Sequence, residues 1–174
     1  MKVLVSAFKP FNSQKINYSA EVLKYIEGVD KCIIDVVYDG CFEELSAKAD
    51  LEEYGLIIAL GEARSRSELT LELQAVNISS CSLADNGGNV KRDEKIDLSA
   101  PEVLNTKVKT VKCEGDILFS HDAGKFVCNN LYFHLLRHYP ERAIFIHIPD
   151  CRENPEKYAE CARRINVIIE KLTC

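Results

Sequence analysis

The sequence predicts a three-layer α/β/α sandwich built on a mostly parallel mixed sheet. Short apolar runs bounded by turn residues alternate along the chain with segments whose apolar residues recur every three or four positions. The runs LIIAL and AIFIHI are apolar on both faces, so helices must cover both sides of the sheet. A chain of 174 residues suits one hydrophobic core, and we therefore expect a single domain over 1–174.

The elements follow in order from these patterns. The predicted strands are KVLVSAF (2–8), CIIDVVY (32–38), GLIIALG (55–61), LTLELQAVNI (69–78), DILFS (116–120) and AIFIHIP (143–149). The predicted helices are NYSAEVLKYIE (17–27), FEELSAKADLEEY (42–54), FVCNNLYFHLLRHY (126–139) and PEKYAECARRINVIIEKL (155–172). The segment 69–78 alternates apolar and polar residues, which indicates a strand near a sheet edge, and the polar segment 84–97 is predicted as a surface loop.

Composition excludes several classes of function. The formal net charge is −5 and no block of Lys or Arg occurs, which argues against nucleic acid or an anionic membrane as the main partner and favours a small or neutral ligand. The opening MKVLVSAF is neither a signal peptide nor a membrane span, so we expect a cytoplasmic protein. The eight cysteines are scattered without a CxxC pair, which predicts that most are reduced thiols and gives no indication of a zinc site.

Candidate chemistry lies where strands end, because loops from several βα units meet at the carboxyl edge of a parallel sheet. Cys128 begins the helix 126–139, where it is either a small core residue or a nucleophile whose thiolate the helix dipole favours. His147, near the end of its strand, is either a packed rim histidine or a general base and acid. Glu72 is either a solvated carboxylate or the group that orients an imidazole. Phe8 and Phe11 either seal the core or bind a flat ring.

Several segments together resemble the pyroglutamyl peptidase family, also called pyrrolidone-carboxylate peptidases of type I, which are cysteine peptidases. SHDAGKFVCN (120–129) is similar to the family's S-x-x-A-G-x-Y-V-C-N segment around the nucleophile, with Phe126 in place of the usual Tyr. ELQAVN (72–77) resembles E-R-V-A-I-N, FIHIP (145–149) resembles F-I-H-V-P, and FKPF (8–11) matches F-x-P-F. LADN (83–86) fits the later part of the I-P-D-N loop, and the segments occur in the family's order.

The resemblance implies a phosphorylase/hydrolase-like α/β/α fold and hydrolysis of an amino-terminal pyroglutamyl residue through an acyl-enzyme. It further implies a peptide substrate with a blocked amino terminus, no metal or cofactor, a cytoplasmic location and a homotetramer or homodimer. A flat, uncharged lactam loses little on leaving water for an aromatic pocket, which agrees with this substrate. The implied catalytic residues are Glu72, Cys128 and His147, and the implied substrate-binding residues are Phe8, Phe11, Glu62, Leu83 and Val127.

The chain also departs from the family pattern. Ser82 stands where the family usually has an Arg that helps to stabilise the oxyanion; Arg64, Arg66 or backbone N–H groups near Cys128 are the possible replacements. Arg64-Ser65 replaces two glycines, Asn12-Ser13 replaces a second glycine pair, Glu62 replaces a Gln and Asp150 replaces a Tyr. Two alternatives therefore stay open: a relative with altered amino-terminal specificity, in which Glu62 suits a free cationic amine, and a binding protein that lacks the oxyanion donor. A nucleoside phosphorylase shares the layers, but no phosphate-binding glycine loop is present.

Overall fold

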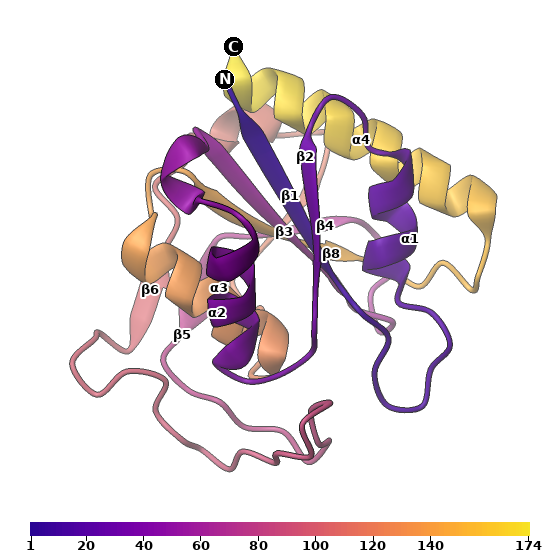
Figure 1. The fold of residues 1–174 in the computed structure, drawn as a ribbon. Helices are drawn as coiled ribbons and strands as arrows, with labels where there is room; N and C mark the ends of the chain where they lie inside the picture. The colour runs from indigo at the N-terminus through magenta and orange to yellow at the C-terminus, as the bar shows by residue number, and fades with distance from the viewer.

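The computed structural model describes all residues 1–174 and shows a six-stranded sheet between two layers of helices (Figure 1). The elements in chain order are β1 (Val3–Phe8), α1 (Tyr18–Tyr25), β2 (Asp30–Ile34), α2 (Gly40–Lys48), η1 (Leu51–Glu53), β3 (Leu56–Glu62), β4 (Thr70–Glu72), β5 (Gln74–Val76), β6 (Val103–Asn105), η2 (Thr110–Cys113), β7 (Leu118–Ser120), α3 (Val127–His138), β8 (Ala143–Ile148) and α4 (Pro155–Thr173). None of the helices has the length and apolar character needed to cross a bilayer.

The main sheet has the order β2-β1-β3-β8-β4-β7. Strands β2, β1, β3 and β8 pair in parallel, β4 runs antiparallel to β8, and β7 pairs in parallel with β4. The predicted fold class is therefore confirmed. The carboxyl ends of β1, β3 and β8 share one edge of the sheet, and the antiparallel β4 brings its own residues alongside the end of β8.

Both faces of the central strands are buried, as the doubly apolar runs predicted. On β3, Ile58 and Leu60 pack in a core with residues of α1 and α4, whereas Ile57 and Ala59 pack in a second core with residues of α2 and α3. Figure 1 shows these helix pairs on opposite sides of the sheet. Because successive side chains of a strand point to opposite faces, His147 on β8 lies on the α3 side of the sheet, between isoleucines that face the other core.

Helix starts follow local capping signals. The Asn17 side chain accepts a hydrogen bond from the Ser19 N–H at 3.0 Å and begins α1. Asn154 caps α4 in the same way, with Pro155 in the first turn. Helix α3 has no side-chain cap at Phe126, so its first-turn N–H groups receive no side-chain acceptor.

Three predicted elements need correction. The strand predicted over 69–78 is two short strands, because Leu73 donates to Ser120 O and accepts from Thr106 N, after which β5 leaves the main sheet to pair with β6, a strand that was not predicted. The strand predicted over 32–38 ends at Ile34, because carboxylate oxygens rather than a neighbouring strand accept the next two backbone N–H groups. The helix predicted over 42–54 starts earlier, at Gly40, and its last turn is the separate η1.

Candidate active site

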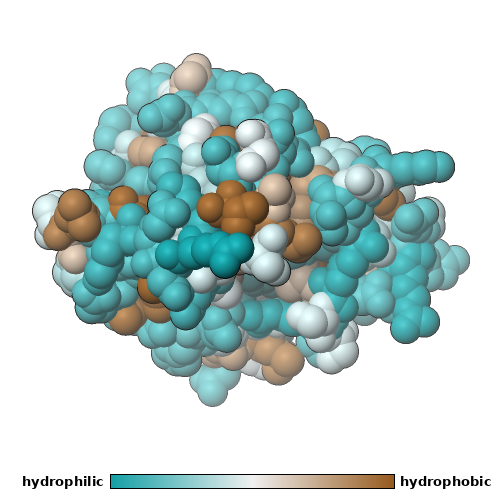
Figure 2. All heavy atoms as spheres, turned by 90° about the horizontal axis from the view of Figure 1, so that it is seen from below, coloured by the Kyte–Doolittle hydropathy of each residue, from teal (hydrophilic) through white to brown (hydrophobic).

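A cavity of about 140 Å³ opens where β1 and β3 end and α3 begins. Figure 2 views the molecule from below Figure 1, the side toward which β1 runs, and shows apolar residues at the surface among hydrophilic ones. The cavity is lined by Phe8, Phe11, Asn17, Val36, Glu62, Ala123, Gly124, Lys125, Phe126, Val127, Cys128 and His147. The structure thus brings the candidate cysteine and histidine to the wall of one cavity.

His147 and Glu72 form a direct pair across neighbouring strands. The antiparallel register of β4 and β8 places Glu72 beside Phe145, and the His147 Nδ1 atom lies 2.7 Å from Glu72 Oε1. Glu72 is fully buried, so the interpretation of it as a solvated carboxylate is wrong. Since Nδ1–H donates to the carboxylate, the second ring nitrogen, Nε2, remains for chemistry at the cavity.

Cys128 lies in the first turn of α3 and packs its sulfur against the backbone of β3. A Cβ atom at Gly61 would lie 2.7 Å from Cys128 Sγ and 2.7 Å from the Phe145 ring. Contacts that short essentially never occur, so this close approach of helix and strand requires glycine at position 61. The absence of one side chain on β3 therefore sets the position of the thiol.

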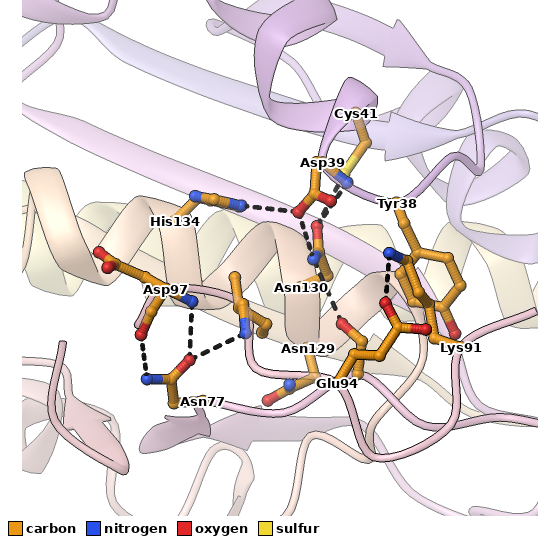
Figure 3. Close-up of polar contacts among 12 residues, drawn as sticks. Tyr38, Asp39, Cys41, Asn77, Lys91, Glu94, Asp97, Asn129, Asn130 and His134 are labelled. Atoms are coloured by element: carbon orange, nitrogen blue, oxygen red, sulfur yellow. Dashed lines mark hydrogen bonds and ion pairs between the residues drawn. The ribbon is translucent and has the colours of Figure 1, made fainter. Parts of the chain in front are cut away.

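Two buried asparagines that follow the cysteine fix the start of α3 (Figure 3). The Asn129 side chain accepts from Val76 N–H at 2.9 Å and donates to the carbonyl oxygens of Val76 and Ile78 at 2.9 and 3.1 Å. Asn130 accepts from Asp39 N–H at 2.9 Å and donates to the Asp39 carboxylate at 2.9 Å. The first turn of the helix is thereby held from β5 on one side and from the start of α2 on the other.

The charge state of Cys128 differs from the expectation based on its helix position. Burial, together with the nearby carboxylates of Glu62 and Glu72, raises the pKa of the thiol to about 12. The predicted preference for the thiolate is therefore wrong for this structure, because desolvation and two nearby anions outweigh the helix terminus. At neutral pH the sulfur carries its proton and needs a base to remove it when it attacks.

Aromatic rings form much of the cavity wall. The Phe11 and Phe126 rings lie 5.7 Å apart between centroids, and Tyr38 meets Phe126 edge-on at 5.5 Å. Phe8 is only 2% exposed and belongs to the core as well as to the wall. The two sequence interpretations of Phe8, core seal and pocket wall, are thus both met by one side chain.

Glu62 reaches the cavity with its charge already paired. Its two carboxylate oxygens accept from Tyr18 N–H at 2.7 Å and from Arg64 Nε at 2.6 Å. The Arg64 guanidinium also lies over the Tyr18 ring, 4.4 Å from the centroid. Because Arg64 balances this carboxylate, the structure disfavours Glu62 as the partner of a free cationic amine.

Other residues named from the sequence lie elsewhere. Leu83 is 40% exposed and does not line the cavity, because its loop is tied to the surface by Asp85 and Asn86, which bond Tyr38 N–H and Val36 O. Ser82, beside it, is exposed. Arg64 and Arg66, the two side chains considered as replacements for the family's oxyanion-binding Arg, do not line the cavity either. The remaining candidate donors are the backbone N–H groups at the start of α3.

Sequence reasoning missed several residues of the site. Asn17, Lys125 and Phe126 line the cavity, and Arg66 forms an ion pair with the buried Glu72. The sequence did carry a signal for Asn17. An asparagine directly before a helical pattern is a common N-cap, and this helix follows the first strand, so its start lies at the edge of the sheet where the site forms. The pairing of Arg66 with Glu72 had no local sign, since nothing in the sequence showed which loop covers this carboxylate.

Comparisons with known proteins agree with this geometry. A family model described as pyroglutamyl peptidase matches residues 1–161. Among curated proteins, pyrrolidone-carboxylate peptidase 2 of Photorhabdus laumondii is 34% identical over 90% of this chain and 81% of its own, and the pyrrolidone-carboxylate peptidase of Thermosipho melanesiensis is 33% identical over 86% and 83%. The crystal structure of the pyrrolidone carboxyl peptidase of Fervidobacterium islandicum superposes with a TM-score of 0.86, at 26% identity over 99% of this chain and 98% of that one.

Proposed function

Because this chain belongs to the pyroglutamyl peptidase family, we propose that it is a cysteine peptidase that removes an amino-terminal pyroglutamyl residue from peptides. The observation that carries the proposal is the Glu72–His147 pair, 2.7 Å apart, beside the cavity that also holds Cys128. A buried carboxylate, an imidazole and a thiol are the groups that acyl transfer through a thioester requires.

In the proposed mechanism, His147 Nε2 accepts the Cys128 proton as Sγ attacks the carbonyl carbon of the pyroglutamyl residue. General-base assistance is needed because burial keeps the thiol protonated at neutral pH. The Glu72 carboxylate holds the ring and stabilises the imidazolium that forms. The tetrahedral oxyanion is bound by first-turn N–H groups of α3, which no side chain caps.

The intermediate then collapses when the imidazolium protonates the departing amine and the C–N bond breaks. The product peptide leaves and a thioester on Cys128 remains. His147 next takes a proton from water, the resulting hydroxide attacks the thioester carbonyl, and the C–S bond breaks with return of the proton to sulfur. Pyroglutamate is released and the resting thiol is restored.

The cavity wall accounts for recognition of the lactam ring. Phe8, Phe11 and Val127 offer apolar surface to a flat, neutral ring, for which desolvation costs little. The Glu62 carboxylate accepts one bond at each oxygen and retains lone pairs for the lactam N–H. The site would discriminate against an amino-terminal proline, because proline lacks the ring carbonyl and therefore offers no lactam N–H–C=O unit.

A relative with altered amino-terminal specificity is the second candidate, and one observation favours it. Ser82 and the Arg64-Ser65 segment, which follows the cavity residue Glu62, differ from the family pattern. The non-catalytic alternative has less support, because a binding protein has no use for a carboxylate buried against an imidazole. Assembly as a homodimer or homotetramer, the single domain over 1–174 and the cytoplasmic location stay predictions.

Turnover of a fluorogenic pyroglutamyl amide tests the proposal. We expect the wild-type protein to release the fluorophore, Cys128→Ser to lose nearly all turnover while keeping its melting temperature, and the exposed Cys174→Ser to match wild type. Cleavage of other amino-terminal amides with no cleavage of the pyroglutamyl amide would establish the altered-specificity alternative. Full activity in Cys128→Ser would refute the assigned nucleophile.

A further inference from the structure

Arg66 contacts the segments that carry all three residues of the proposed triad. Its Nη2 atom lies 2.7 Å from Glu72 Oε1 and 2.6 Å from the carbonyl oxygen of Asp122, in the segment that leads into α3 and Cys128. Its own carbonyl oxygen accepts from the N–H of Asp150 at 3.1 Å, at the end of the strand that carries His147. One residue thus joins the carboxylate, the approach to the thiol and the end of the histidine strand.

The charge balance at Glu72 depends on the same residue. Glu72 is fully buried, its ion pairs are with Arg66 and His147, and both of these residues contact Oε1. The remaining oxygen, Oε2, has no hydrogen-bond partner in the protein. A buried carboxylate without a permanent counter-ion is costly, and Arg66 is the one permanently charged cation in contact with Glu72.

We propose that Arg66 is a positioning residue of this enzyme, which clamps the triad segments together and holds Glu72 as an anion so that His147 can stay neutral before the attack. The role of Arg66 in catalysis rests on the proposed function, whereas the contacts that Arg66 makes do not depend on it. Arg66 acts through Glu72 and not on the substrate, because its side chain does not line the cavity. This role differs from that of an oxyanion donor, which must reach the reacting carbonyl.

The groups around the Glu72–His147 pair fix the direction of the pH effect. They are Arg66 from the loop after β3, Glu62 at the end of β3, Cys128 on α3 and, through its hydroxyl bond to the Glu72 carbonyl, Tyr132 on α3. Loss of the Arg66 cation raises the affinity of the pair as a whole for a proton, whichever partner receives it. The active form, with ionised Glu72 and neutral His147, then survives only at higher pH.

The test compares Arg66→Gln and Arg66→Lys with wild type. For Arg66→Gln we expect kcat to fall about 100-fold with KM nearly unchanged, because a displacement of the catalytic groups by about 1 Å has that effect. The acid limb of its kcat/KM profile should move up by about 1 to 3 pH units, the range that loss of an adjacent opposite charge produces. Arg66→Lys keeps the charge on a shorter side chain that cannot place its nitrogen where Nη2 lies, so its acid limb should match wild type while kcat falls about tenfold.

A double-mutant cycle with Glu72→Gln separates action through Glu72 from direct contact with substrate. In the Glu72→Gln background, Arg66→Gln should cost only about tenfold, because the bond to the Asp122 carbonyl is still lost but no carboxylate is left to balance. The same loss in both backgrounds would overturn the proposal, as would wild-type kcat and an unmoved acid limb in Arg66→Gln. Arg152→Gln is the matched control, since Arg152 is exposed, pairs only with Asp150 and should match wild type.

The rate at which iodoacetamide alkylates Cys128 gives a readout that needs no pyroglutamyl substrate. Arg66→Gln should slow this alkylation at neutral pH, because less His147 is available to accept the thiol proton. If wild type does not cleave the pyroglutamyl amide, the proposed function fails, but this alkylation test of Arg66 still decides. If Arg66→Gln does not fold, Arg66→Lys carries the test, and wild-type kcat and alkylation in that variant would refute the clamp.

Discussion

Replacing Gly61 with alanine should displace the Cys128 sulfur from its position against β3. The new Cβ atom would lie 2.7 Å from Cys128 Sγ and 2.7 Å from the Phe145 ring, whereas ordinary contact begins at 3.4 Å. The separation from the sulfur must therefore widen by about 0.7 Å. Alanine fits a strand better than glycine does, so any loss of stability or activity comes from this overlap.

The sulfur yields more easily than the ring. Phe145 is fully buried, and its centroid lies 5.6 Å from the Tyr132 ring and 4.9 Å from the His147 ring, so the ring has no space to retreat. Cys128 is half-buried and borders the cavity, into which its side chain can move. We expect overpacking to cost about 1 to 3 kcal/mol of stability and the displaced thiol to lower kcat about 10- to 100-fold.

Two assays check the reasoning. Thermal unfolding should show Tm lowered by about 2 to 4 °C for each kcal/mol lost, and turnover of the pyroglutamyl amide should show the fall in kcat. Gly55→Ala is the matched control, because its Cβ overlaps only the Met1 side chain, which is 74% exposed and can rotate away. Wild-type kcat and Tm in Gly61→Ala would show that the sulfur does not lie where the structure places it.

Two further predictions concern the ring pocket and the thiol. Phe11→Ala should raise KM about tenfold with little change in Tm, because Phe11 is half-buried at the cavity. Phe8→Ala should instead lower the free energy of unfolding by about 3 to 5 kcal/mol in a urea titration, because Phe8 is only 2% exposed. Equal losses of Tm in the two variants would contradict this division. The rate of Cys128 alkylation should keep rising above the pH at which an ordinary thiol titrates, near 8.5, since its raised pKa of about 12 keeps the sulfur protonated below that pH. The rate is measured by mass spectrometry, with the exposed Cys174 as internal reference. A pH profile of Cys128 alkylation with its midpoint below pH 7 would contradict the prediction.

Much of the fold and part of the site could be predicted from residue order alone. Runs such as LIIAL and AIFIHI require cover on both faces, and the structure supplies it from two helix pairs. The segments around Glu72, Cys128 and His147 each resembled a family segment, and the chain belongs to that family. Such signals are local: they depend on side-chain period, on turn residues and on short motifs, which are complete within a few neighbouring positions.

The tertiary structure decided what depends on which distant segments meet. It buried Glu72, which alternation along the strand had placed on a polar face, by setting it between β7 and β8. It raised the pKa of Cys128 where the helix position suggested the reverse, and it left Leu83 outside the cavity. It also set the Arg66 guanidinium against the buried carboxylate. Burial, charge balance and close approach are properties of the surroundings of a residue, and those surroundings form only when the chain folds.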